Sequence, residues 1–114
     1  MNDCIFCKII KGEIPCNKVY EDEEFFAFHD INPIARVHFM IVPKHHVASL
    51  LECDAGYDEE MLGRLLLLAP KLAKAQGLQG GFKTAINTGK EGGQVVFHLH
   101  VHVYGGGKLS HLEQ

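Results

Sequence analysis

The segment Phe97-His98-Leu99-His100-Val101-His102-Val103-Tyr104 alternates histidine with apolar residues. A period of two is typical of a β-strand, in which successive side chains point to opposite faces. The pattern therefore predicts one face with three imidazoles, about 6.5 Å apart at the usual strand rise, and an opposite face that packs on a core. Histidine changes charge closest to neutral pH, so such a row suits acid–base, nucleophilic or metal-binding chemistry. Zinc ligation by a His-x-His pair and plain surface exposure are the alternative interpretations.

A glycine-rich segment, Asn87-Thr88-Gly89-Lys90-Glu91-Gly92-Gly93-Gln94, precedes the histidine row. Glycines let a ligand approach the backbone closely, and successive N–H groups in such turns bind anions. Together with the histidines, this segment predicts a phosphate held against imidazoles. His100 is the predicted nucleophile because it has a histidine on either side. A neutral imidazole with one free nitrogen attacks phosphorus and forms a covalent intermediate.

The size and charge of the chain narrow its class. Its 114 residues predict a single domain over residues 1–114, and 46% apolar with 22% charged residues is ordinary for a soluble globular protein. A net charge of −3 favours neither a nucleic-acid partner nor a membrane surface. The apolar run at residues 65–70 is too short to cross a membrane. Residues 1–4 have no basic region or apolar run, so we expect no signal peptide and a cytoplasmic protein.

Periodicity predicts an α+β domain with a five-stranded, mostly antiparallel sheet, one long helix and one short helix. The connections are too short for repeated parallel crossovers. Strands are predicted at residues 19–21, 25–28, 37–42, 82–87 and 97–104, a short helix at 4–12, and a helical turn at 48–51. The long helix is expected from the N-cap Asp58 to Gln76. Leu66 and Leu67 widen its apolar stripe, so we expect it to be buried between the sheet and a partner.

The four cysteines do not form a pattern typical of a disulfide framework. Cys4 and Cys7 make a Cys-x-x-Cys motif, whereas Cys16 and Cys53 are isolated. A thioredoxin-type role for the pair would need a preceding strand, and the residues before Cys4 are too few to build one. Metal binding and two ordinary thiols are the two interpretations left.

The segment from His98 to Tyr104 resembles the signature of the histidine triad (HIT) family, in which three histidines alternate with apolar residues. Further segments that resemble the family are Cys4-Ile5-Phe6-Cys7-Lys8-Ile9-Ile10, Phe28-His29-Asp30-Ile31, His38-Phe39, Pro43-Lys44-His45-His46 and Gly92-Gly93-Gln94. The likeness is greatest to the nucleotide-binding branch, whose members are homodimers that hydrolyse purine nucleoside 5′-phosphoramidates. It implies a HIT-like sheet extended across a homodimer, a purine nucleotide partner, and a nucleotidyl intermediate on His100.

Two other functions are compatible with the same residues. One is a dinucleoside polyphosphate hydrolase of the same superfamily. The other is a nucleotide-binding regulatory or interaction module, because an intact site does not define a cellular role. The sequence does not distinguish adenine from guanine, nor does it identify the leaving group.

The resemblance also assigns roles to single positions. His100 matches the nucleophile, His102 the residue on the phosphate, and His38 and His98 the remaining catalytic histidines. Asp30 matches the ribose-binding carboxylate, and Val95 stands where relatives have a polar residue near the leaving group. The nucleotide-binding set that the resemblance implies is Phe6, Ile9, Phe28, Asp30, Ile31, Asn87, Gly93, Val95, His100 and His102. From the residues alone, a place in the core is the better explanation for Phe6, Ile9, Phe28 and Ile31.

Several bacterial-type members hold structural zinc through the Cys-x-x-Cys pair, a histidine after the Pro-Lys pair and the first triad histidine. The corresponding residues are Cys4, Cys7, His46 and His98, with His45 as an adjacent alternative to His46. A histidine bound to zinc in this way is unable to act as an acid–base group. The tail at residues 108–114 is short and lacks the tryptophan that some relatives extend toward the partner's site.

Overall fold

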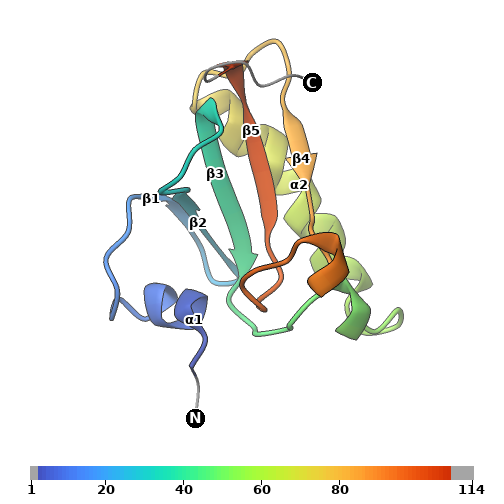
Figure 1. The fold of residues 1–114 in the computed structure, drawn as a ribbon. Coiled ribbons are helices and arrows are strands. Elements are labelled where there is room, and N and C mark those ends of the chain that lie inside the picture. Colours follow the sequence, from blue (N-terminus) through green and yellow to red (C-terminus); the bar gives the residue numbers. More distant parts are fainter. Residues whose placement is uncertain (1–2, 109–114) are drawn as a thin grey trace.

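A computed structural model describes residues 3–108, in which one antiparallel sheet has the strand order β1-β2-β3-β5-β4 (Figure 1). Its strands are β1 (Lys18–Glu21), β2 (Phe25–His29), β3 (Ala35–Pro43), β4 (Lys83–Ala85) and β5 (Val101–Lys108). The helices are α1 (Ile5–Ile10) and α2 (Glu59–Ala75), with 3₁₀ turns at Leu50–Glu52 and Lys90–Gly92. The predicted α+β class with five strands and two helices is confirmed. The short tail lies almost entirely outside the described residues.

The two faces of the sheet pack differently because side chains alternate along β2 and β3. On one face Phe39, Ile41 and Val103 are fully buried against Leu65 and Leu72 of α2, the long helix that runs behind the sheet in Figure 1. On the other face a smaller cluster gathers beneath α1; its members are Phe6, Phe26, Phe28, Met40 and Val42. The main core therefore fills one side and leaves the opposite side for a site.

The predicted histidine strand is wrong in its bounds. Regular pairing in β5 begins at Val101 rather than Phe97, and it continues through Gly105 to Lys108. In this register Pro43, the last residue of β3, lies opposite Leu99, so Phe97 and His98 have no β3 residue to pair with; the last pair is Ile41 with Val101. Before that point the chain is held differently, for example by the Leu99 N–H that donates to the Val47 carbonyl at 2.8 Å.

Other elements differ from the prediction in detail. The fourth strand spans only Lys83–Ala85, whose residues pair with Tyr104, Val103 and His102 of β5. Asp58 does occupy the N-cap of α2, but its carboxylate accepts the Asp54 N–H at 2.7 Å instead of capping the helix. The expected helical turn is a 3₁₀ turn two residues later, at Leu50–Glu52.

The described chain leaves part of α2 open. Leu66 is 46% exposed and Leu67 is 75% exposed, so their predicted burial against a partner stays a prediction. The sheet edges are β1 and β4, both short. No helix within residues 3–108 combines the length and apolar character needed to cross a membrane.

Candidate functional site

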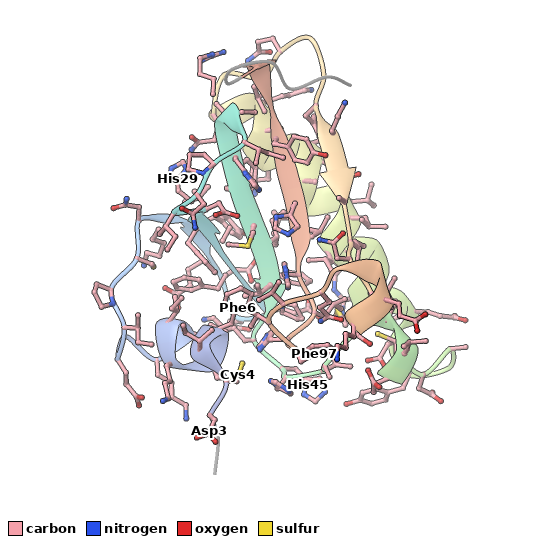
Figure 2. All side chains as sticks on the ribbon, viewed as in Figure 1. Asp3, Cys4, Phe6, His29, His45 and Phe97 are labelled. Carbon is pink, nitrogen blue, oxygen red and sulfur yellow. The ribbon has the colours of Figure 1, made fainter. Side chains whose placement is uncertain are left out.

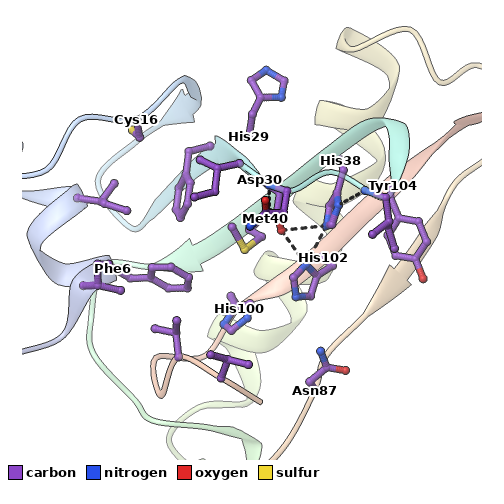
Figure 3. A pocket seen from close by; sticks show the side chains of 18 of the residues that line it. Phe6, Cys16, His29, Asp30, His38, Met40, Asn87, His100, His102 and Tyr104 are labelled. Carbon is purple, nitrogen blue, oxygen red and sulfur yellow. Dashed lines mark hydrogen bonds and ion pairs between the residues drawn. The ribbon is translucent and has the colours of Figure 1, made fainter. Parts of the chain in front are cut away.

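A cavity of about 690 Å³ lies on the face of the sheet opposite α2, among α1, β2, β3 and β5 (Figure 3). This volume is in the range that binds small molecules and cofactors. The cavity is lined by all ten residues of the predicted nucleotide-binding set: Phe6, Ile9, Phe28, Asp30, Ile31, Asn87, Gly93, Val95, His100 and His102. His38 lines it as well, whereas His98 does not. That these residues bind a nucleotide stays a prediction.

One end of the cavity is apolar. The rings of Phe6 and Phe28 meet edge to face with centroids 5.3 Å apart, and both side chains are buried. These two residues therefore belong to the core and also line the cavity. Burial in the core and a place in the cavity wall, the two interpretations of these positions, are both correct for them. Ile31 is different, because at 89% exposure it lies at the rim. A flat, weakly polar ring fits such an end.

His100 has a defined proton position. Its Nδ1 lies 2.7 Å from the His98 carbonyl oxygen, which is solely an acceptor, so Nδ1 carries the proton. Nε2 then keeps its lone pair. Burial lowers the pKa of His100 below its usual range, although the hydrogen bond to His98 and the charge of Asp30 act in the opposite direction. A neutral ring with a free Nε2 is the state that a nucleophile requires.

His38 and His102 form a relay beside it (Figure 3). The Ile34 N–H donates to His38 Nδ1 at 3.2 Å, so the proton of neutral His38 lies on Nε2. His38 Nε2 is 3.0 Å from His102 Nδ1, which accepts that proton's hydrogen bond and leaves His102 protonated at Nε2. Asp30 Oδ2 approaches the same two nitrogens, at 3.4 Å from His38 Nε2 and 3.9 Å from His102 Nδ1.

Both relay histidines are neutral near pH 7. Burial lowers the pKa of His102 to about 4, with smaller contributions from His100 and His38. Burial also lowers the pKa of His38, against the opposing charge of Asp30. Asp30, His38 and His102 lie close enough to hold a cation. A cation would need the lone pair of His38 Nε2, however. Because Nδ1 accepts the Ile34 N–H, the proton of the neutral ring lies on Nε2, and no lone pair is left there for a cation. The arrangement therefore favours proton positioning over metal binding.

The glycine-rich segment is held in place by the buried side chain of Gln94. Its amide oxygen accepts the Gly89 N–H at 2.9 Å, and its nitrogen donates to the carbonyls of Ala48 at 2.7 Å and Val96 at 3.0 Å. Gly93 has φ 85°, a left-handed conformation that other residues adopt at a cost. The amide thus fixes the turn that brings Gly93 to the cavity.

A second cluster lies next to the cavity and contains Cys4, Cys7, His46 and His98. His98 Nδ1 is 3.3 Å from Cys4 Sγ, 3.6 Å from Cys7 Sγ and 3.1 Å from His46 Nδ1, while Cys7 Sγ is 3.5 Å from His46 Nδ1. In a tetrahedral zinc site, bond lengths of 2.0–2.3 Å place the ligand atoms about 3.3–3.8 Å apart. Three of the four distances lie in this range and the one between the two Nδ1 atoms, at 3.1 Å, is slightly shorter, so the donor set and the spacing are close to those of a four-ligand metal site.

The proton on His98 supports the same conclusion. Its Nε2 lies 2.7 Å from the Pro43 carbonyl oxygen, so Nε2 carries the proton and Nδ1 presents its lone pair to the cluster. Neither ring nitrogen faces the cavity, so the geometry gives His98 no acid–base contact with a ligand there. His45, the alternative to His46, is not part of the cluster.

Sequence reasoning missed several cavity residues. Tyr104 lies two positions after His102 and its ring centroid is 5.4 Å from that of His38, so the alternation itself could have placed it on this face. Met40 lies opposite His102 in the sheet, and finding it would have required the register between β3 and β5. Ile14, Pro15 and Cys16 reach the cavity from the connection after α1, where no periodic signal exists.

Comparison with known protein families identifies the class. The HIT domain family model matches residues 11–109, most of the chain. The chain therefore belongs to the HIT family.

Individual relatives agree over nearly the whole length. Protein HitA from Neisseria gonorrhoeae is 53% identical over 105 residues, which are 92% of this chain and 97% of HitA. The crystal structure of a HIT family hydrolase from Legionella pneumophila superposes with a TM-score of 0.88 at 42% identity, over 96% of this chain and 97% of that chain. A Zn-bound histidine triad family protein from Mycobacterium smegmatis has a TM-score of 0.80 at 34% identity, over 96% and 77% of the two chains.

The role of the Gln94 amide gives a stability prediction. In Gln94→Glu the carboxylate is unable to donate to the carbonyls of Ala48 and Val96. The free energy of unfolding should fall by at least about 1–3 kcal/mol, the cost of leaving a buried polar group unsatisfied. Urea denaturation followed by circular dichroism measures it. Gln79→Glu is the control, because this exposed amide after α2 also donates to a carbonyl, that of Lys74 at 3.2 Å; an equal effect in both variants would contradict the role of Gln94.

Proposed function

We propose that the protein is a nucleotidyl hydrolase that cleaves purine nucleoside 5′-phosphoramidates through a covalent intermediate on His100. The observation that carries the proposal is the unprotonated Nε2 of His100 in a cavity of nucleotide size. The apolar end formed by Phe6 and Phe28 fits a purine base, and Asp30 is a carboxylate with the capacity to accept two ribose hydroxyls. The relative from Legionella pneumophila is a hydrolase of the same family.

The first step forms a bond between His100 Nε2 and phosphorus and breaks the bond from phosphorus to nitrogen. The departing amine takes a proton from solvent as it leaves. His102, protonated at Nε2 because its Nδ1 accepts from His38, donates a hydrogen bond to a phosphoryl oxygen. The backbone N–H of Val95, which lines the cavity, is a further donor for a phosphoryl oxygen, whereas that of Gly93 already donates to the Lys90 carbonyl at 3.1 Å.

In the second step water attacks phosphorus, the bond from phosphorus to His100 Nε2 breaks, and the water loses a proton to solvent as the nucleoside monophosphate is released. The Nδ1–H bond to the His98 carbonyl persists through both steps, so the ring returns to the tautomer from which it started. Dividing one displacement into two is the general advantage of covalent catalysis.

The nucleophile is tested with His100→Ala and adenosine 5′-phosphoramidate. Turnover should fall by at least about 10⁴-fold, as it does when another covalent enzyme loses its nucleophile. Intact mass spectrometry during turnover should detect a nucleotidyl adduct on the wild type and none on the variant. His45→Ala, an exposed histidine outside the cavity, is the control that should keep its activity.

Three results would contradict the proposal. One is sustained turnover by His100→Ala. Another is the same adduct on that variant. The third is faster cleavage of a dinucleoside polyphosphate than of the phosphoramidate by the wild type, which would favour the other hydrolase of the superfamily.

We further propose that the cluster of Cys4, Cys7, His46 and His98 holds structural zinc. The spacing of the four ligand atoms supports this, as does the zinc bound in the relative from Mycobacterium smegmatis. When bound, zinc would close a four-ligand site that ties the start of α1 to the segment before β5. With all four positions filled by protein, such an ion supplies stability rather than a reactive water.

Two neighbouring histidines provide a paired test of this site. His46→Ala should lower zinc affinity by at least about 10-fold to 100-fold, because it removes one of the four ligands. His45→Ala should retain one zinc per chain. Competition with a chromophoric chelator measures both affinities. Equal retention by the two variants would rule out His46 as a ligand, and loss in His45→Ala alone would show that the neighbouring histidine has this role.

We also propose a homodimer, supported by the exposed apolar side chains of Leu66 and Leu67 on α2. Leu67→Glu should weaken the dimer by at least about tenfold, because burying an unpaired carboxylate costs several kcal/mol. Sedimentation velocity over a range of protein concentrations measures this. Leu51→Glu, at a position that is 74% exposed outside α2, is the control. A wild type that sediments as a monomer at all concentrations would contradict the proposal.

A further inference from the structure

Helix α1 belongs to both the cysteine–histidine cluster and the cavity. Cys4 is its N-cap and Cys7 lies within it, while Phe6 and Ile9 line the cavity. Figure 2 shows Cys4 and Phe6 together at this end of the molecule. A helix of six residues is not stable on its own, so its position depends on its contacts. Its two buried side chains are Phe6 and Cys7. Phe6 makes apolar contacts, and Cys7 supplies a sulfur atom to the cluster.

Phe6 connects the cluster to the nucleophile. Its ring meets that of His98 at a centroid distance of 6.0 Å and that of His100 at 5.1 Å, edge to face in both cases. It also packs on Phe28, at the apolar end of the cavity. A shift of α1 would therefore move the wall of the cavity and the packing around His100 together.

His98 makes a second connection through its own backbone. Its ring lies in the cluster with Nδ1 toward Cys4, Cys7 and His46, and its carbonyl oxygen accepts the Nδ1–H of His100. A ligand that fixes the ring of His98 thus also restrains the group that sets the tautomer of His100. Both connections run between the same two sites.

We propose that the cluster is a positioning element for the nucleotide site, so that zinc and nucleotide bind with positive coupling. The proposal rests on the proposed nucleotide-binding function and on zinc as the ligand of the cluster. Filling the cluster holds α1 and the backbone of His98 in the geometry that the nucleotide needs. By thermodynamic linkage, the nucleotide must raise the affinity for zinc by the same factor that zinc raises the affinity for the nucleotide.

The test measures this factor in both directions. Isothermal titration gives the Kd of AMP for the zinc-loaded protein and for protein stripped with EDTA. We expect stripping to weaken AMP about tenfold, within the usual range of coupling between sites. Competition with a chromophoric chelator gives the zinc affinity with and without saturating AMP, and it should rise by an equal factor.

The Phe6→Leu variant separates specific coupling from simple unfolding of the stripped protein. It keeps all four ligand side chains but removes the ring that lies between His98 and His100. The ratio of AMP affinities with and without zinc should fall toward one in this variant. If stripping merely unfolds the protein, the ratio stays as large as in the wild type, and this overturns the proposal. Cys53→Ser, outside both sites, should keep the wild-type factor.

The remaining outcomes distinguish this proposal from the one on which it rests. Equal AMP affinity in the loaded and stripped proteins overturns the coupling and leaves the nucleotide function standing. No AMP binding by either form contradicts the nucleotide function and the coupling together. Failure of the wild type to bind zinc removes the coupling while hydrolysis is unaffected.

Discussion

The hydrogen bond from His100 Nδ1–H to the His98 carbonyl, at 2.7 Å, is the contact on which the site depends. It places the free lone pair on Nε2, the only ring nitrogen then able to attack. The acceptor is itself held, because the ring of His98 donates from Nε2 to the Pro43 carbonyl and turns Nδ1 to the cysteines. Backbone geometry, rather than a carboxylate partner, therefore prepares the nucleophile.

Packing determines where the two cavity histidines point. Leu99, Val101 and Val103 are buried in the core beneath α2, and each such side chain stabilises the fold by about 1.5–3 kcal/mol. This burial directs His100 and His102 to the opposite face, where each keeps a hydrogen-bonded nitrogen. Burying a neutral imidazole that has a hydrogen-bond partner costs little free energy there, whereas burying a charged imidazolium would cost its hydration. The lowered pKa values follow from this balance.

The sequence was sufficient for the architecture because alternation and helical periodicity report which faces are buried. It also identified residues that meet at one cavity although Phe6 and His102 are far apart in the chain. It failed where tertiary neighbours determine a strand boundary or the direction of a side chain. The start of β5 depends on where β3 ends, so Phe97 was wrongly included in a strand. Alternation likewise grouped His98 with the other two histidines, whereas the Pro43 carbonyl and the cysteines direct its ring elsewhere.

The most direct test of the account is the tautomeric state of each histidine, measured by nitrogen-15 NMR through two-bond proton–nitrogen couplings in the ligand-free protein near pH 7. We expect His100 to carry its proton on Nδ1 and to have an unprotonated Nε2. We expect the opposite arrangement for His38 and His102, with protons on Nε2. A proton on His100 Nε2, or a doubly protonated His100 ring, would contradict the central claim, because no lone pair would face the cavity.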